Sequence, residues 1–340
     1  MNSEKNYYSG VFSHIYVEKK AKAYPRTQQI LEEFPKSKVI EIDHYKDVFC
    51  RRGQNPKLQA NGKALILAVK EGQLIYEGAN VCQSFGNEYF YYTSCVMNCL
   101  YDCEYCYLKG MYPSGHMVVF VNLEDIFSEV EAILKKHSAY ICVSYDTDLM
   151  PLEQVLGYIK TWINFAEKHT DLKIEIRTKC GRTDLWDCFS NEILNKKNVI
   201  FAFTISPQRI VEGCEHGTSS LESRLEAASL TMELGFSVRL FFDPMIYCPN
   251  WREHYDAMMT MVEERINLTR LVDVSVGSFR ISQDYLKKMR RNAPTSQIVQ
   301  FPYQNVKGVY QYPSEILEEM EQYMTERLLQ HIPETKIFRW

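Results

Sequence analysis

The sequence predicts an α/β fold built on an incomplete (β/α) barrel of six units. From about residue 86 onward, six strand-like segments alternate with helix-like segments, an order that implies parallel strands joined by right-handed crossovers. The 340 residues are 46% hydrophobic and 24% charged, which is an ordinary globular composition for a chain of this length. Barrels of this kind carry their chemistry at the C-terminal ends of the strands.

The expected strands are short segments rich in β-branched and aromatic residues. They cover residues 88–92, 139–143, 173–178, 199–205, 237–242 and 272–276. Helices are expected between them at residues 123–136, 151–168, 221–234 and 252–266, with a further helix opened by Asp184.

Capping residues support two of these helices. Asn122 can cap the helix that runs to about Lys136, because Asp125 follows three residues later in the capping-box position. Gly235 follows the helix of residues 221–234, as a glycine at the C′ position does.

The two ends of the chain differ from the central repeat. Residues 1–85 contain only short helical and strand-like pieces, at 27–34, 39–42 and 64–68, and predict a small N-terminal α/β subdomain. Residues 86–297 form the predicted barrel, and residues 298–340 a C-terminal extension of a hairpin and a helix opened by Pro313-Ser314. Apolar residues at helical spacing in this last helix predict a core-packing stripe. They are Ile316, Leu317, Met320, Met324 and Leu328.

Charge and cysteine content limit the possible environments. The net charge is −4 and the pI is about 6.1, which is not the overall electrostatic footprint of a DNA-binding protein. The basic runs at 19–22 and 287–291 are expected to be solvated helix faces, although a groove can be positive on an acidic protein. No apolar run approaches the ~20 residues of a membrane span, and the N-terminus lacks a signal-peptide core. Eleven cysteines without a secretory signal favour a reducing cytoplasm.

Three cysteines directly after the first expected strand carry the main chemical signal. Cys99, Cys103 and Cys106 have the spacing C-x3-C-x2-C. Three thiolates on one loop can hold three irons of a [4Fe–4S] cluster and leave the fourth iron open, whereas electron-carrier ferredoxins supply four cysteines. A structural zinc site is an alternative, but such sites usually pair two cysteine knuckles and no second knuckle follows. Buried structural cysteines are the other alternative, and Cys95 has no assigned role.

This spacing, with Tyr105 before the last cysteine, is similar to the signature of the radical SAM superfamily, whose open iron binds S-adenosylmethionine (SAM). The sequence Cys-Glu-Tyr-Cys-Tyr-Leu resembles the cluster loop of the spore photoproduct lyase family, which repairs a methylene-bridged thymine dimer in DNA. The resemblance covers nearly the whole chain and implies a TIM-like radical SAM barrel. Its further motifs are VVFVNLEDIF, Thr178-Lys179, His216-Gly217-Thr218-Ser219-Ser220 and Arg224-Leu225.

The resemblance also implies a SAM site. Lys179 corresponds to a family lysine that holds SAM, and an ammonium group can bind a carboxylate or ribose oxygens. Thr204 corresponds to a serine that contacts SAM, and Thr147 and Asp148 correspond to a Ser-Asp pair. Asp243 stands where the family has alanine, so it is expected to contact SAM through its backbone or not at all.

The residue that returns a hydrogen atom to the substrate is open. The family uses a cysteine followed by Thr-Ser-Asp, and a gapless alignment places Tyr145 at that position, with Cys142 three residues earlier. Cys142 reaches the site only if the loop carries an insertion, and it also fits a buried strand residue. Tyr105 and Tyr107 retain a family tyrosine pair that either relays the radical or packs against the cluster loop.

A second departure concerns the substrate. The family has an Arg-Tyr wedge on a hairpin, where this chain has Gln304-Asn305. The leading hypothesis is a radical SAM lyase that acts on DNA carrying a thymine dimer and receives electrons from a flavodoxin or ferredoxin. The alternatives are a radical SAM relative with another nucleic-acid or small-molecule substrate, and a non-catalytic metal- or nucleic-acid-binding protein.

Overall fold

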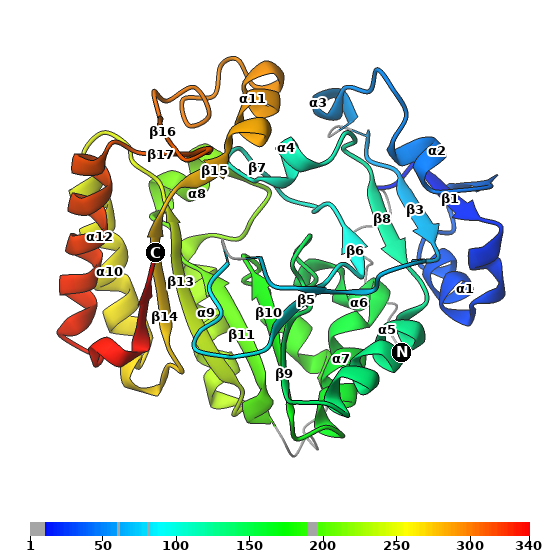
Figure 1. Cartoon of the computed structure of the whole chain (residues 1–340), viewed down its shortest axis with the longest axis horizontal. Coiled ribbons are helices and arrows are strands. Elements are labelled where there is room, and N and C mark those ends of the chain that lie inside the picture. Colours follow the sequence, from blue (N-terminus) through cyan, green and yellow to red (C-terminus); the bar gives the residue numbers. More distant parts are fainter. Residues whose placement is uncertain (1–10, 60–61, 80–81, 190–195) are drawn as a thin grey trace.

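A sheet of eight strands, in the order β18-β14-β13-β11-β10-β9-β5-β4, forms the centre of the computed structural model, which describes residues 11–59, 62–79, 82–189 and 196–340 (Figure 1). The six predicted strands are present as consecutive parallel neighbours. Antiparallel β4 (Ile75–Glu77) and parallel β18 (Ile337–Arg339) are the two edges, so the sheet is open. The six strands are β5 (Phe90–Thr93), β9 (Ala139–Cys142), β10 (Leu172–Thr178), β11 (Val199–Thr204), β13 (Ser237–Met245) and β14 (Val274–Ser278).

Both faces of this sheet are buried, which explains why its strands appear as nearly continuous apolar runs. In β9, Ile141 packs into the main hydrophobic core on the helix-covered face, whereas Tyr140 and Cys142 pack on the opposite face. This opposite face is called the inner face below. The outer helices include α5 (Leu123–Leu134), α7 (Tyr158–Glu167), α9 (Leu221–Glu233), α10 (Trp251–Arg265) and α12 (Ser314–Leu329).

Three local predictions about helices need correction. The helix expected at 151–168 is interrupted at Gly157, whose φ of 61° separates α6 (Glu153–Leu156) from α7. The segment opened near Asp184 is a 3₁₀ helix, Thr183–Cys188. Asn122 precedes α5 but makes no side-chain cap, because its amide bonds the backbone N–H and C=O of Lys70 instead. Gly235 has the positive φ expected after α9.

A second sheet lies beside the first and contains strands from both sides of residue 86 (Figure 1). Its order is β2-β1-β3-β8-β6. Strand β4, from the predicted N-terminal subdomain, pairs with β5 in the main sheet, so strand pairing crosses this boundary in both directions. The division at 85/86 and 297/298 stays a prediction. The strands are β1 (His14–Glu18), β2 (Lys38–Ile42), β3 (Leu65–Ala68), β6 (Val96–Met97) and β8 (Met117–Phe120).

The C-terminal part contains the predicted hairpin and helix. Strands β16 (Gln304–Val306) and β17 (Val309–Gln311) meet at Lys307 and Gly308, which both have positive φ, as in a type I′ turn. Strand β15 (Arg280–Ser282) pairs with β17 and leads into α11 (Gln283–Asn292). In α12, Met320, Met324 and Leu328 are buried and Ile316 and Leu317 are half-buried, which confirms the core-packing stripe. No helix among the described residues is long and apolar enough to span a bilayer.

Candidate active site

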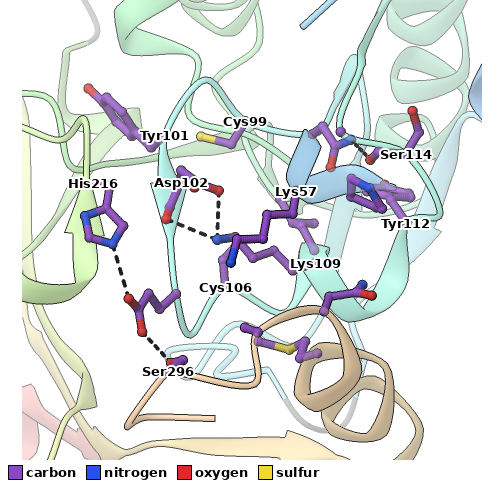
Figure 2. A pocket seen from close by; sticks show the side chains of 18 of the residues that line it. Lys57, Cys99, Tyr101, Asp102, Cys106, Lys109, Tyr112, Ser114, His216 and Ser296 are labelled. Carbon is purple, nitrogen blue, oxygen red and sulfur yellow. Dashed lines mark hydrogen bonds and ion pairs between the residues drawn. The ribbon is translucent and has the colours of Figure 1, made fainter. Parts of the chain in front are cut away.

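The cysteine loop lies between β6 and the short helix α4 (Leu108–Met111), at the C-terminal side of the main sheet (Figures 1 and 2). Cys99, Cys103 and Cys106 are free thiols. Burial raises the pKa of all three thiols, that of Cys99 to about 12, so the thiols must lose protons to bind metal. Nearby Lys179 lowers the pKa of Cys103 and Cys106 against this effect of burial.

The arrangement of these thiols bears on the kind of metal group. Among the residues that the structure describes, no three His, Cys, Asp or Glu side chains converge on one point that could hold a single ion. A [4Fe–4S] cluster does not need such convergence, because each thiolate binds a different iron. The arrangement of the three cysteines is therefore compatible with a cluster.

Lys63, which lies just before β3 of the second sheet, binds the backbone of this loop. Its buried Nζ donates hydrogen bonds to the carbonyl oxygens of Cys99, at 2.8 Å, and Leu100, at 2.7 Å. Burial lowers the pKa of Lys63, while nearby Cys99 and Asp102 act in the opposite direction. Sequence analysis missed this role, since Lys63 precedes Cys99 by 36 positions.

The predicted SAM-binding residues gather at the C-terminal ends of the parallel strands. Thr147 and Asp148 follow β9, Lys179 follows β10, and Thr204 ends β11. Asp148 accepts hydrogen bonds from the Lys179 N–H at 2.7 Å and the Thr178 hydroxyl at 2.9 Å. Burial raises its pKa to about 6 despite these bonds. Asp148 thus connects the loop after β9 to the end of β10.

Two polar groups at these strand ends lack partners. The buried Thr147 hydroxyl has no hydrogen bond within the described ranges. Lys179 Nζ forms no hydrogen bond or ion pair with any residue that the structure describes. It lies 5.6 Å from the centroid of the Tyr105 ring. Buried polar groups are usually satisfied, so the unpaired Thr147 hydroxyl fits a polar ligand. The half-buried Lys179 ammonium fits an anionic group, such as the carboxylate of SAM.

A buried ion pair explains the predicted His-Gly-Thr-Ser-Ser and Arg-Leu motifs. Arg224 pairs with Glu215, both fully buried, and donates to the Thr204 carbonyl at 3.1 Å. Glu215 also accepts hydrogen bonds from the Ser206 and Tyr105 hydroxyls. The Tyr105 hydroxyl is thereby committed to Glu215, which fixes the cysteine loop to the end of β11.

The Asp243 carboxylate is paired within the protein and is therefore not free to bind a ligand. Its two carboxylate oxygens pair with the Arg280 guanidinium, at 3.0 Å each, and one also accepts from Trp340 Nε1 at 3.0 Å. A backbone contact to SAM stays a prediction for this residue.

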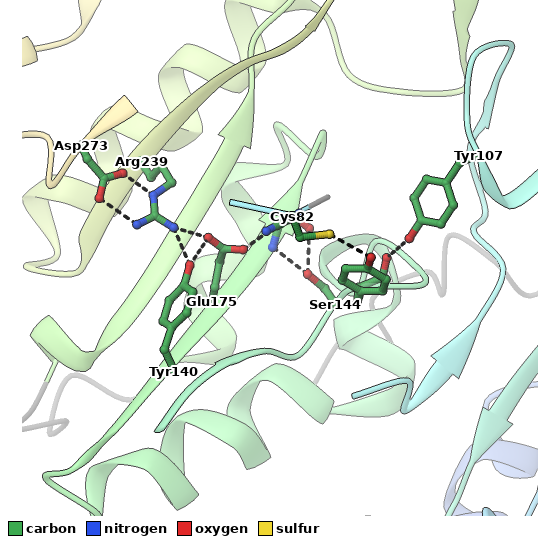
Figure 3. Close-up of polar contacts among 9 residues, drawn as sticks. Cys82, Tyr107, Tyr140, Ser144, Glu175, Arg239 and Asp273 are labelled. Atoms are coloured by element: carbon green, nitrogen blue, oxygen red, sulfur yellow. Dashed lines mark hydrogen bonds and ion pairs between the residues drawn. The ribbon is translucent and has the colours of Figure 1, made fainter. Parts of the chain in front are cut away.

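The predicted hydrogen-donor region lies on the inner face and contains a thiol that sequence analysis missed (Figure 3). Cys82 Sγ lies 3.0 Å from the Tyr145 hydroxyl oxygen, at hydrogen-bond distance. The Tyr145 ring stacks on Tyr92, with centroids 4.1 Å apart. Tyr107 donates a hydrogen bond to the Tyr145 carbonyl at 2.7 Å and lies 3.5 Å from Asp146 Oδ1. These contacts bring together one thiol and the phenols of Tyr145 and Tyr107, two side-chain types that can carry a radical.

Two other cysteines have simpler surroundings. Cys142 is fully buried in β9, within an apolar cluster that includes Phe90 and Phe241 and borders Tyr145 and Cys82. Cys95 is also fully buried, and its thiol donates to the Val143 carbonyl at 3.4 Å, so it packs beneath the loop. Its pKa is raised to about 12 by burial.

A buried network lies next to this region on the inner face (Figure 3). Arg239 pairs with Asp273 and Glu175, and Glu175 also pairs with Arg177. The Arg239 guanidinium lies 3.3 Å from the ring centroid of Phe85, which also contacts Phe241 in β13. The segment that carries Cys82 and Phe85 is therefore anchored across the main sheet, and this anchoring brings Cys82 to Tyr145.

Comparison with known proteins identifies the family. The family model described as spore photoproduct lyase matches residues 11–339. The chain is 23% identical to the spore photoproduct lyase of Clostridium acetobutylicum, over 92% of this chain and 94% of that protein. It is 22% identical to the Bacillus subtilis enzyme, over 71% and 70% of the two chains.

Solved structures share the fold. An alanine variant of spore photoproduct lyase superimposes with a TM-score of 0.82 at 19% identity, covering 97% of this chain and 98% of the other. A second variant, solved with bound AdoMet and dinucleoside spore photoproduct, gives 0.80 at 20% identity over the same shares of the two chains. Because the family model spans almost the entire sequence, the chain belongs to the spore photoproduct lyase family of radical SAM enzymes.

Proposed function

We propose that this protein uses a [4Fe–4S] cluster and SAM to reverse the methylene-bridged thymine dimer in DNA. The observation that carries the proposal is the meeting of the three-cysteine loop with strand ends at which Lys179 and Thr147 present unpaired polar groups. The Clostridium relative is a spore photoproduct lyase, and a related structure holds both AdoMet and dinucleoside spore photoproduct. In this proposal the six parallel strands serve as a partial (β/α)6 barrel around the cofactors.

The cofactor residues have distinct roles in this proposal. Cys99, Cys103 and Cys106 hold the cluster, which together with SAM supplies a 5′-deoxyadenosyl radical. Lys179 binds the SAM carboxylate or ribose oxygens, and Thr147 and Thr204 donate hydroxyl hydrogen bonds. Asp148 holds the Lys179 backbone in position. The Asp243 carboxylate takes no part, because Arg280 already neutralises it.

The side chains on the inner face return the hydrogen atom after the dimer has fragmented. The Cys82 thiol gives its hydrogen atom to the thymine methylene radical, so that an S–H bond breaks and a C–H bond forms. The sulfur then takes a hydrogen atom from the Tyr145 hydroxyl, 3.0 Å away. Tyr107, whose hydroxyl bonds the Tyr145 carbonyl, in turn gives its phenolic hydrogen atom to Tyr145. The Tyr107 radical then takes one electron from the flavodoxin or ferredoxin and one proton from water. Cys142 and Tyr105 are left in structural roles, as a buried strand residue and a partner of Glu215.

One observation favours a second candidate. The position of the family wedge holds Gln304 and Asn305, which are both exposed. The Asn305 side chain is used within the hairpin, where it accepts from the Gly308 N–H at 3.0 Å and donates to Gln283 at 2.8 Å. A radical SAM enzyme for another nucleic-acid lesion or a small molecule is therefore the alternative. The non-catalytic binding protein is disfavoured by membership of an enzyme family.

An anaerobic repair assay tests the proposal. Reconstituted protein, dithionite and SAM are mixed with DNA carrying spore photoproduct, and both restored thymine and 5′-deoxyadenosine are quantified by chromatography. Formation of both products supports the lyase. Cleavage of SAM without restored thymine supports the second candidate. A wild-type protein that binds iron and sulfide but cleaves no SAM contradicts both.

A further inference from the structure

A pocket of about 220 Å³ lies beside the cysteine loop (Figure 2). Cys99 and Cys106 form part of its lining, together with Lys57, Lys109 and Asn292. The pocket is not lined by the strand-end residues that are proposed to bind SAM or to position its ligands, which are Thr147, Asp148, Lys179 and Thr204. The pocket therefore borders two of the proposed cluster cysteines without bordering the residues proposed to hold SAM.

Three short elements build the pocket. Lys57 comes from α3 (Pro56–Gln59), Lys109 from α4, and Met289 and Asn292 from α11. Helix α4 approaches α11 closely because Gly110 has no side chain. A Cβ at this position would lie 2.5 Å from the Tyr285 Cβ. The cysteine loop thus reaches the molecular surface between α3 and α11.

These flanking elements carry uncompensated positive charge. Arg51, Arg52 and Lys57 are exposed before and within α3, and Lys288 and Arg291 are exposed on α11. Among the described residues none of these five cations forms an ion pair, whereas Lys109 within the pocket is neutralised by Asp102 at 2.7 Å. The protein as a whole has a net charge of −4, whereas these free cations stand on or next to α3 and α11, the two elements that flank the pocket.

An apolar side chain lies within the charged rim. Leu58, next to Lys57 on α3, is 71% exposed, the largest value among the exposed large hydrophobic residues described. Transient redox complexes bury small interfaces, and complementary charge steers their encounter. An exposed leucine beside Lys57, on the short helix that borders a pocket lined by Cys99 and Cys106, has the composition of such an interface.

We infer that this surface is the docking site of an acidic one-electron carrier protein, and this inference rests on the proposed cluster function. The carrier loses one electron and the cluster gains it, so no bond forms or breaks. The positive rim orients the acidic carrier, Leu58 provides the apolar contact, and the electron crosses only the loop of Cys99 and Cys106. DNA is the less favoured occupant, because Cys82 and Tyr145, which return the hydrogen atom in the proposed function, do not line the pocket.

The test compares two charge reversals of equal size. The double variant Lys57→Glu/Lys288→Glu reverses the charge of two of the five cations that flank the pocket, and is called the rim variant. The matched control is Lys135→Glu/Lys136→Glu, which changes two exposed lysines at the C-terminal end of α5. The probe is a purified flavodoxin. Its binding to the protein without cluster is measured by titration at low and high salt, and the rate of cluster reduction is measured by rapid mixing of reconstituted protein with reduced flavodoxin.

We expect the rim variant to bind flavodoxin about tenfold more weakly at low salt, with a flatter salt dependence. Its cluster reduction should slow by a similar factor, while the control variant stays at the wild-type values. SAM cleavage driven by dithionite should be unchanged in both variants.

Unchanged flavodoxin binding and reduction in the rim variant would overturn the inference. So would a variant that keeps both but loses affinity for an undamaged DNA duplex, since the surface would then belong to DNA. Failure of the proposed function is read separately. Wild-type protein that cleaves no SAM with dithionite contradicts that function, whereas flavodoxin binding to the cluster-free chain is still measured.

Discussion

Lys63 places a buried ammonium group against the backbone of the cysteine loop. Its two hydrogen bonds hold the carbonyl groups of Cys99 and Leu100, next to the first cluster thiol. Hydrogen bonds to charged groups contribute about 1.5–3 kcal/mol each. The strands next to and within the cysteine loop have only two residues each. We therefore expect the two Lys63 hydrogen bonds to stabilise the positions of the three thiols more than this strand pairing does.

The variant Lys63→Met keeps an unbranched apolar stem and removes both hydrogen bonds. We expect less iron and acid-labile sulfide per chain after anaerobic reconstitution, and a free energy of unfolding lower by about 2 kcal/mol. Lys57→Met, in the same pocket, is the control and should keep the wild-type iron content. A full complement of iron in Lys63→Met would contradict the fastening role.

Cys82 and Cys142 offer a second test at single residues. Cys82 touches the Tyr145 hydroxyl, whereas Cys142 is enclosed in β9. We expect Cys82→Ala to lower thymine restoration at least about tenfold while SAM cleavage persists, because only hydrogen return is lost. Cys142→Ala should retain most of the repair. The reverse pattern, measured in the chromatographic assay, would return the donor role to Cys142.

At the scale of elements, the contact of α4 with α11 positions the cysteine loop next to the C-terminal part of the chain. Gly110 permits the contact, since a Cβ there would also lie 2.6 Å from the Tyr285 Cα and 2.7 Å from its carbonyl oxygen. Backbone atoms cannot move aside as a flexible side-chain end can. The close approach of these two helices therefore requires glycine.

We expect Gly110→Ala to lower the free energy of unfolding by about 1–3 kcal/mol, because overpacking forces a shift of α4 or α11. Gly213→Ala in α8 (Gln208–Cys214) is the matched control, since nothing lies within 4 Å of its added Cβ. That change should be neutral or stabilising. Equal urea midpoints for the two variants would show that the α4–α11 contact is loose.

The sequence predicted the type of most elements but not every boundary or partner. The six parallel strands and the helices α9, α10 and α12 follow from local apolar patterns and are present. Asn122 has the chemistry of a helix cap, yet its amide bonds the backbone of Lys70, which follows the neighbouring strand β3, because that backbone is buried and needs partners. Local pattern could not reveal this competing contact.

At the scale of the whole molecule, buried carboxyl groups link stability to pH. Glu153 accepts hydrogen bonds from the N–H groups of Ile159 at 2.7 Å and Lys160 at 2.9 Å, and burial still raises its pKa from 4.5 to about 7. The folded protein therefore keeps a proton that the unfolded chain has already lost between these two values. The stabilising contribution of Glu153 is complete below pH 4.5 and is lost as pH rises through 7.

We expect the wild-type free energy of unfolding to fall between pH 5 and pH 8 by up to about 3 kcal/mol more than that of Glu153→Gln. The two free energies are measured by urea unfolding across this range. Glu233→Gln, an exposed carboxyl at the end of α9, serves as the control. Parallel curves for the wild type and Glu153→Gln would show that Glu153 ionises normally in the folded protein.

The sequence by itself determined the alternating strands and helices and the family, and it predicted the three cysteines of the proposed cluster site. Each is written in contiguous residues: Cys99, Cys103 and Cys106 need only their spacing, and a buried strand needs only its apolar run. The comparisons confirmed the family.

Tertiary structure alone decided which distant groups meet. It placed Cys82 against Tyr145, 63 positions apart, put β8 in the second sheet, committed the Asp243 carboxylate to Arg280, and brought α3 and α11 to one pocket beside the cysteine loop. The physical reason is that side-chain periodicity encodes which face of an element is buried, whereas its partner is chosen by packing the whole chain. Contacts between segments so far apart leave no local pattern in the sequence.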